Sequence, residues 1–187
     1  MEKKKFVGRA GDKLDFALRE FNIDVAGKTC ADFGSSVGGF VDCFLQNGVK
    51  KVYAIETGYG VLDWGLRNNP KVVVMERTNA MHVELPEKVD LISIDTSWTR
   101  QKNIIPNALA NLKDNGEIIT LIKPHYEADK TLLRKGKLSE EGSEAIAKDV
   151  AENLKDLKVK VKGFAKSPVL GGSAKNVEYV AYLERVE

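Results

Sequence analysis

The sequence predicts an α/β protein with a Rossmann-like, seven-stranded, mostly parallel sheet that ends in an antiparallel hairpin. Short apolar runs alternate with segments of helical periodicity, which is typical of parallel strands covered by helices on both faces. The last two runs are instead joined by SPVLGGSAKN, which has no helical pattern and favours an antiparallel connection. The predicted strands are 28–33, 51–56, 71–76, 90–95, 116–123, 158–166 and 177–186.

The first half of the chain shows the alternation clearly. Residues 12–21 carry apolar side chains at helical spacing, and KTCADF (28–33) is a strand-like run that ends in an acid and a glycine turn. A helical pattern follows at 40–48 and stops at a glycine. KVYAIE (51–56) and KVVVME (71–76) are β-rich runs that predict the next two strands.

The second half continues the series. DLISID (90–95) and GEIITLIK (116–123) are apolar strand-like runs, and the segment between them, 103–116, has a helical pattern that closes on Asn-Gly. After a polar stretch, the pattern of residues 140–157 predicts a long amphipathic helix. The two final runs alternate apolar and polar residues, as half-buried strands do.

Composition favours one globular domain. The 187 residues, 43% of them hydrophobic, predict a single domain over 1–187 with a short basic N-terminal arm at 1–11. No apolar run approaches the ~20 residues that span a bilayer, and the start lacks a signal peptide's apolar core, so we expect a cytoplasmic protein. Cys30 and Cys43 match no metal motif and are expected to be buried thiols, and no metal site is predicted.

A glycine-rich turn, DFGSSVGGF (32–40), follows the first predicted strand, at the edge of the sheet where such folds bind ligands. A P-loop is excluded because no Lys and Ser/Thr follow the last glycine, and a dinucleotide loop lacks its second glycine. S-adenosylmethionine fits better. Its ammonium group would donate to Asp32, and its carboxylate would meet backbone N–H groups at Gly34, Gly38 and Gly39.

Polar residues also follow the second and third strands. Glu56 is placed to bind ribose hydroxyls, as the acid does in dinucleotide sites. Thr78 and Asn79 could frame the adenine. Spacing alone leaves an NAD-type site and a glycine turn without a ligand as alternatives.

Ionisable residues end two central strands, Asp95 and Lys123, and Lys13 and Glu178 could complete a group of two lysines and two carboxylates. A buried lysine is costly unless it is paired or loses its proton. Such a lysine could remove the proton of an acceptor hydroxyl during methyl transfer. The alternative is that Lys123 and Asp95 form only a structural ion pair.

The chain resembles the FtsJ-like ribosomal RNA 2′-O-methyltransferases, and most closely their TlyA/hemolysin A subfamily. The motifs that carry the resemblance cover nearly the whole chain in the family's order. They are GRAGDKLDFAL (8–18), DFGSSVGGFVDCFLQNG (32–48), VYAIETGYGVLDWGLRNNPKV (52–72), ERTNA (76–80), DLISIDTSW (90–98), LIKPHYE (121–127), SPVLGG (167–172) and NVEYV (176–180).

The resemblance implies a class I methyltransferase fold, S-adenosyl-L-methionine as the methyl donor and RNA, in particular ribosomal RNA, as the partner. It also implies a Lys-Asp-Lys-Glu tetrad with Lys123 as the base. In this reading Lys13 would favour the neutral form of Lys123 and contact RNA. The implied tetrad is Lys13, Asp95, Lys123 and Glu178. The implied donor-binding residues are Asp32, Gly34, Ser36, Gly38, Gly39, Phe40, Glu56, Thr78, Asn79 and Asp95.

The sequence departs from the family pattern in places that concern RNA. The subfamily usually begins with an S4-type RNA-binding domain, whereas this sequence begins with a basic arm that carries Lys3, Lys4, Lys5 and Arg9. Either the sequence is a piece of a longer chain, or we expect the protein to find its RNA differently. This arm suits either a polyanion or a solvated chain start, and a basic segment at 130–137 suits either an RNA-contacting lid or a solvated loop.

Several aromatic residues lie next to these motifs. Trp98 and Tyr126 could stack on a base, although we expect Trp98 to be packed under a loop and His125 to be solvated. Tyr59 and Trp64 suit either an adenosine cover or core packing.

Two other functions remain as alternatives from the sequence. One is a non-catalytic RNA- or partner-binding protein, or a hemolysin-like protein, on a methyltransferase fold. The other is a nicotinamide-dependent oxidoreductase. No oligomeric state is predicted.

Overall fold

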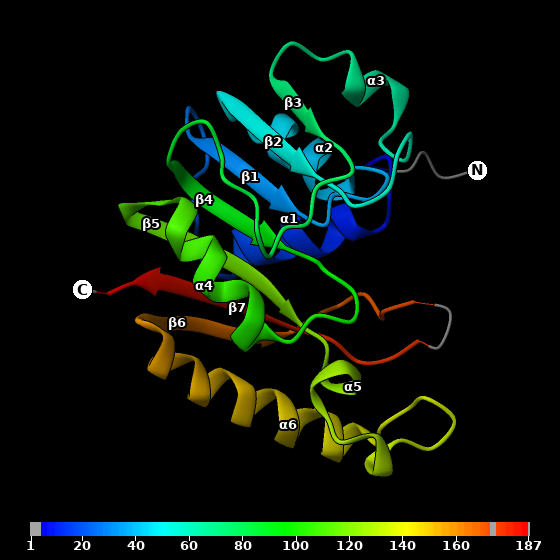
Figure 1. Cartoon of the computed structure of the whole chain (residues 1–187). Coiled ribbons are helices and arrows are strands. Elements are labelled where there is room, and N and C mark those ends of the chain that lie inside the picture. The colour runs from blue at the N-terminus through cyan, green and yellow to red at the C-terminus, as the bar shows by residue number, and fades with distance from the viewer. Residues whose placement is uncertain (1–4, 173–174, 187) are drawn as a thin grey trace.

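The structure, a computed structural model, describes residues 5–172 and 175–186 and contains one seven-stranded sheet in the order β3-β2-β1-β4-β5-β7-β6 (Figure 1). The strands are β1 (Thr29–Phe33), β2 (Lys51–Ile55), β3 (Val72–Met75), β4 (Val89–Ile94), β5 (Leu112–Ile122), β6 (Val159–Lys166) and β7 (Tyr179–Arg185). The helices are α1 (Ala10–Glu20), α2 (Gly39–Gln46), α3 (Trp64–Arg67), α4 (Gln101–Asn111), α5 (Pro124–Glu127) and α6 (Glu140–Asn153), with short 3₁₀ turns η1 (Lys130–Leu132) and η2 (Leu154–Leu157).

The predicted fold class is confirmed. Strands β1 to β5 pair in parallel, and β7 pairs antiparallel with both β5 and β6. The final hairpin therefore adds to the sheet with its last strand innermost. The strand order reverses between β1 and β4. From β1 the chain continues to β2 on one side, and from β4 it continues to β5 on the other side. Doubly wound sheets bind their ligands at such a switch point.

Helices cover both faces of the sheet (Figure 1). Helices α1, α2 and α3 pack Leu14, Phe44 and Leu66 against one face, and α4 and α6 pack Ile104 and Ala147 against the other. Both strand faces are therefore apolar, which explains why the strands read as nearly continuous hydrophobic runs. The two cysteines are buried as predicted, and burial raises the pKa of each thiol to about 12.

The boundary between α4 and β5 differs from the prediction. The helix ends at Asn111 rather than at Gly116, and β5 starts at Leu112. The buried Asn111 amide accepts from the Leu85 N–H and donates to the Val83 carbonyl, so this side chain ties the helix end to a neighbouring loop. The short helices α3 and α5 were not predicted, because one turn is too short to show a periodicity.

The basic N-terminal arm is only partly described. Lys3 and Lys4 lie outside the described residues, whereas Lys5 pairs with Asp15 at 2.7 Å. Lys13 belongs to α1 and is buried. In the described ranges, no helix is long and apolar enough to cross a membrane.

Candidate active site

The glycine turn after β1 lies against the loop after β4. Gly34 has φ +93°, and a Cβ at this position would come 2.8 Å from the Asp95 carbonyl oxygen. The Asp95 N–H donates to the Phe33 carbonyl at 3.0 Å, so the two strand ends are joined directly. A side chain at Gly34 would push the two strand ends apart. Both this close approach and the positive φ explain why glycine occupies the position.

The other two predicted glycines help to pack α2. Gly38 has φ +100° at the N-cap, and a Cβ there would meet Leu66 at 2.3 Å. A Cβ on Gly39 would come 2.8 Å from the Gly11 N, so this glycine lets α2 approach the start of α1. Gly39 also lines a cavity described below, whereas Gly38 lies behind it against Leu66.

The first cavity, of about 370 Å³, opens between the ends of β1, β2 and β4. The Glu56 carboxylate lies in its wall and accepts from the Ser36 and Gly58 N–H groups at 2.9 and 2.8 Å. These backbone donors fix the carboxylate at the end of β2. Other predicted donor-binding residues in the wall are Gly34, Ser36, Thr78, Asn79 and Asp95.

The second cavity, of about 290 Å³, contains the predicted tetrad. It shares four wall residues with the first cavity, which makes the two halves of one cleft. The shared residues are Gly34, Ser36, Asp95 and Ser97. The remaining predicted residues in its wall are Lys13, Asp32, Gly39, Phe40, Lys123 and Glu178.

The four tetrad side chains alternate in charge. Lys13 Nζ lies 2.5 Å from Glu178 Oε2 and 4.0 Å from Asp95 Oδ2, and Lys123 Nζ lies 2.5 Å from Asp95 Oδ1. Lys123 Nζ also donates to the Thr96 carbonyl at 3.1 Å. They come from α1, the β4 end, the β5 end and the residue before β7, so the sheet brings together four distant parts of the sequence. None of the four side chains is more than 15% exposed, and this exclusion of bulk water strengthens each interaction.

Asp32 lies deeper in the cleft than its neighbours. It is fully buried, and its Oδ1 accepts from the Ser93 hydroxyl at 2.7 Å. Burial raises the pKa of this carboxyl to about 8, against the lowering effect of the Ser93 hydrogen bond. A cationic group entering the second cavity would favour the ionised form of Asp32.

Two buried hydroxyls in the cleft have no hydrogen-bond partner within residues 5–172 and 175–186. They are Ser35 Oγ in the second cavity and Thr96 Oγ1 in the first. Buried hydroxyls are normally satisfied, so both point to a polar ligand in the cleft. Ser35 was not predicted as a site residue; its position between Gly34 and Ser36 is the only sequence signal for it.

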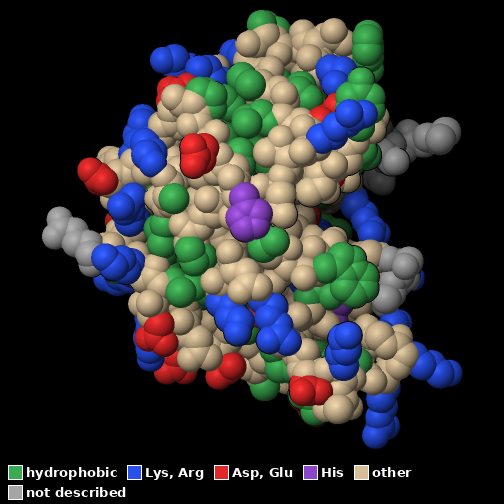
Figure 2. Space-filling model, in the orientation of Figure 1, with side chains coloured by type: hydrophobic (Ala, Val, Ile, Leu, Met, Phe, Trp, Pro, Cys, Tyr) green, Lys and Arg blue, Asp and Glu red, His purple; other side chains and the backbone are tan. Residues whose placement is uncertain are grey.

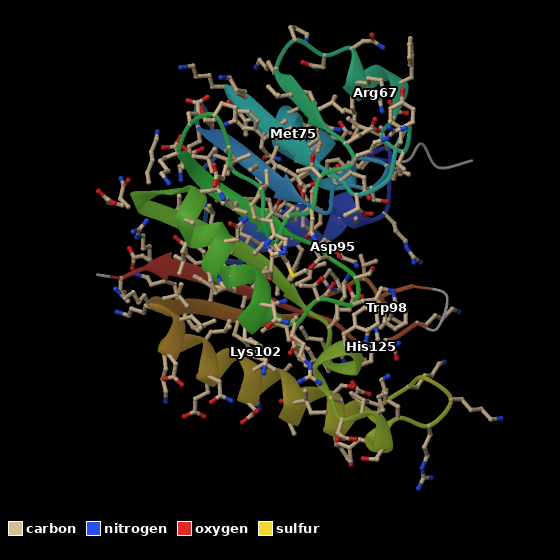
Figure 3. The ribbon with its side chains drawn as sticks, in the orientation of Figure 1. Arg67, Met75, Asp95, Trp98, Lys102 and His125 are labelled. Carbon is tan, nitrogen blue, oxygen red and sulfur yellow. The ribbon has the colours of Figure 1, made fainter. Side chains whose placement is uncertain are left out.

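Aromatic side chains flank the opening. Trp98 is 83% exposed and has φ +61°, so the expectation that it is packed under a loop is wrong. Its ring centroid lies 4.8 Å from that of Tyr126, which in turn lies 4.1 Å from that of His125 (Figure 3). His125 is half-buried rather than solvated, and burial together with the nearby Lys123 charge lowers its pKa.

Two further aromatic residues are exposed. Tyr59 and Trp64 are 71% and 75% exposed, so neither packs in the core, and neither lines the two cavities. Sequence reasoning also missed Gly8 and Arg9, which line the second cavity just before α1. Their place in the GRAGDKL motif, next to Lys13, was the available signal. In the described part of the chain, no cluster of three or more His, Cys, Asp or Glu residues could hold a metal ion.

The strand order, the cleft at the β1–β4 switch point and the acid after β2 define a class I, S-adenosylmethionine-dependent methyltransferase fold. More specifically, the chain belongs to the FtsJ-like methyltransferase family, whose model matches residues 6–185. The resemblance seen in the sequence is thus confirmed, and the nicotinamide-dependent alternative is excluded.

The chain is 36% identical over 188 residues to the 16S/23S rRNA (cytidine-2′-O)-methyltransferase TlyA of Mycobacterium tuberculosis, covering 96% of this chain and 69% of that protein. A solved Streptococcus thermophilus protein that carries the name hemolysin superposes with a TM-score of 0.94 at 36% identity, over 100% of this chain and 69% of that one. Curated relatives are longer than this chain, which spans 66% to 76% of three of them.

A more distant structure shows the fold alone. It is the 1,6-didemethyltoxoflavin-N1-methyltransferase of Burkholderia thailandensis, solved with S-adenosylhomocysteine, with a TM-score of 0.65 and 13% identity over 96% of this chain and 78% of that one.

The residues of the cleft fit S-adenosylmethionine. The first cavity offers the Glu56 carboxylate to ribose hydroxyls and lies beside Thr78 and Asn79, which could hold the adenine. The second offers Asp32 to an ammonium group and the unpartnered Ser35 hydroxyl to a carboxylate. The wall shared by the two cavities, at Gly34 and Asp95, lies between these groups and next to the tetrad.

Proposed function

We propose that the protein transfers a methyl group from S-adenosylmethionine to a ribose 2′-hydroxyl of RNA, with ribosomal RNA as its substrate. The observation that carries the proposal is the alternating tetrad at the wall shared by the two halves of the cleft. Relatives with the TlyA name act on ribosomal RNA at cytidine 2′-hydroxyls, which supports the substrate class.

When bound, S-adenosylmethionine supplies an electrophilic methyl group on its sulfonium. Lys123 Nζ would accept the proton of the 2′-hydroxyl as the hydroxyl oxygen bonds to the methyl carbon and the carbon–sulfur bond breaks, with S-adenosylhomocysteine as the leaving group. For this step the amine must be uncharged. Lys13 lies between Glu178 and Asp95 and is the second cation of the tetrad.

The carboxylates of the tetrad act as positioning groups. Asp95 accepts from Lys123 Nζ at 2.5 Å, and the Thr96 carbonyl accepts from the same nitrogen at 3.1 Å. These two acceptors would engage the two N–H groups of the neutral amine and so fix the direction of its lone pair. Glu178 holds Lys13 at 2.5 Å. Catalysis in this site depends mainly on aligning donor and acceptor, with the base as a further contribution.

The exposed aromatic pair suits the acceptor nucleotide. Trp98 lines the first cavity and stands against Tyr126 with its other surface exposed to solvent. Single-stranded RNA bases are commonly bound by stacking on such side chains. We assign Trp98 the role of a platform for the base whose ribose enters the tetrad.

The test is methylation of isolated ribosomal subunits with labelled donor by the wild-type protein and by Lys123→Met. Loss of the base should lower the rate by about 10²–10⁴-fold, while calorimetry should find the donor affinity unchanged. Lys113→Met, at the opposite end of β5, is the matched control and should behave as wild type. A structural ion pair without catalytic function predicts a less stable variant that retains its turnover, and retained turnover refutes the assigned base.

The product identifies the acceptor atom. Methylation of a ribose 2′-oxygen makes the adjoining phosphodiester resistant to alkali, whereas methylation of a base does not. A labelled product that alkali degrades completely to mononucleotides would refute the 2′-hydroxyl as the acceptor.

A further inference from the structure

The connection between α5 and α6 contains a tight hairpin. Arg134 and Lys137 exchange backbone hydrogen bonds of 2.9 and 3.1 Å, and the two residues between them, Lys135 and Gly136, have φ +51° and +76°. Positive φ at both central positions is the geometry of a type I′ turn. Residues 130–137, called here the basic hairpin, therefore have a defined shape rather than that of a loose loop.

The basic hairpin is joined to the tetrad through one neighbouring loop. The Asn176 side chain donates to the Gly136 carbonyl at 3.4 Å, and the Asn176 and Gly171 backbones exchange two hydrogen bonds. Gly171 in turn contacts Glu178 so closely that a Cβ would come 1.8 Å from its Oε1. These contacts link the hairpin, through Asn176 and Gly171, to Glu178 in the wall of the second cavity.

The hairpin carries an uncompensated positive charge. Four exposed cations lie on it, close together in the sequence, and none of them has an ion-pair partner in the described ranges. The acid next to the segment, Asp129, already accepts from the N–H and hydroxyl of Thr131. Figure 2 shows Lys and Arg side chains projecting from this corner of the molecule. The four cations are Lys130, Arg134, Lys135 and Lys137.

We propose that the basic hairpin binds the sugar–phosphate backbone of the acceptor RNA next to the nucleotide that enters the tetrad. The inference rests on the proposed function, because it takes RNA as the acceptor. Exposed guanidinium and ammonium groups without an ion-pair partner can bind phosphates without first breaking an existing ion pair. The turn is hydrogen-bonded to the same loop that packs on Glu178, which connects the hairpin to the tetrad.

The experiment compares two charge-matched variants, both with four cations replaced by glutamine. The hairpin variant changes Lys130, Arg134, Lys135 and Lys137. The control variant changes Lys50, Lys113, Lys160 and Lys162, which are exposed residues at the amino ends of strands or on the edge strand β6. Binding to isolated ribosomal subunits is measured across a series of salt concentrations, together with KM for the subunits, kcat, donor affinity and thermal stability.

The hairpin variant should bind the subunits at least tenfold more weakly at 0.1 M salt. The slope of log K against log salt should become shallower by about 0.7–0.9 for each phosphate that the protein no longer neutralises. Its kcat, donor affinity and thermal stability should equal those of the wild type, and the control variant should keep the full slope. An unchanged slope and KM overturn the proposal, including in the case where the hairpin binds an acidic protein. A fall in kcat alone also overturns it, because the hairpin would then act through Glu178.

The binding measurement separates this inference from the proposed function. If the wild-type protein binds the subunits but methylates no RNA, the proposed function fails while the salt slope still reports on the hairpin. If the wild-type protein binds no RNA, both fail.

Discussion

Replacing Gly34 by alanine tests whether the cleft depends on the contact between the β1 and β4 ends. The new Cβ would lie 2.8 Å from the oxygen and 3.1 Å from the carbon of the Asp95 carbonyl, and backbone atoms cannot move aside as a flexible side chain can. Alanine at φ +93° also carries the steric cost of left-handed backbone, about 1–2 kcal/mol.

Gly27 provides a matched control. It has φ +71°, and nothing lies within 4 Å of its built Cβ, so Gly27→Ala carries the backbone cost alone. Overpacking adds about 1–3 kcal/mol. We therefore expect Gly34→Ala to lower the free energy of unfolding by about 1–3 kcal/mol more than Gly27→Ala does. Because the displaced Asp95 lies in the wall of both cavities, donor affinity should also fall, by about tenfold for each 1.4 kcal/mol of binding free energy lost.

The assays are urea denaturation by linear extrapolation and titration calorimetry with S-adenosylmethionine. If the two variants lose equal stability and both bind the donor as tightly as the wild type, the cleft does not depend on the contact between Gly34 and the Asp95 carbonyl. Loss of stability in Gly34→Ala with unchanged donor affinity would show that the strand ends separate without altering the binding walls.

Two further predictions concern Asp32 and Trp98. Because burial raises the pKa of Asp32 to about 8 from 3.8, the folded protein keeps a proton between about pH 4 and 8 that the unfolded chain releases. Stability should therefore fall as pH rises through this range, and Asp32→Asn should flatten the dependence in denaturation curves; an equal slope in both proteins would contradict the assignment. Trp98→Ala should change the free energy of unfolding by less than about 0.5 kcal/mol, because the side chain is 83% exposed. It should nevertheless raise KM for ribosomal subunits, since stacking contributes about 1–3 kcal/mol per base. Trp64→Ala, also exposed but outside both cavities, should leave KM unchanged, and equal effects of the two tryptophans would argue against a platform.

The sheet was predictable because its strands are short apolar runs buried on both faces, and their alternation with helices restricts the topology. The α4–β5 boundary was not, because it depends on side-chain hydrogen bonds of Asn111 to residues 26 and 28 positions away in the sequence. The prediction that the helix ends at Asn-Gly used only neighbouring residues and could not take these distant hydrogen-bond partners into account.

The site shows the same division. Asp32, Gly34 and Glu56 were predicted from strand ends and glycine spacing. The sequence also suggested Lys13 and Glu178 as partners of Asp95 and Lys123, but only the fold shows that the four side chains meet. The exposure of Trp98 was missed because its left-handed backbone turns the side chain outward, and a non-glycine residue with positive φ leaves no mark in the sequence.

The ion pair between Lys13 and Glu178 joins residues 165 positions apart, in the first helix and just before the last strand. During synthesis the first of these leaves the ribosome long before the second is translated. The tetrad therefore cannot assemble on a nascent chain until nearly all of the described sequence has emerged. The proposed methyl transfer therefore requires the segment that leads into the last strand as well as the first helix.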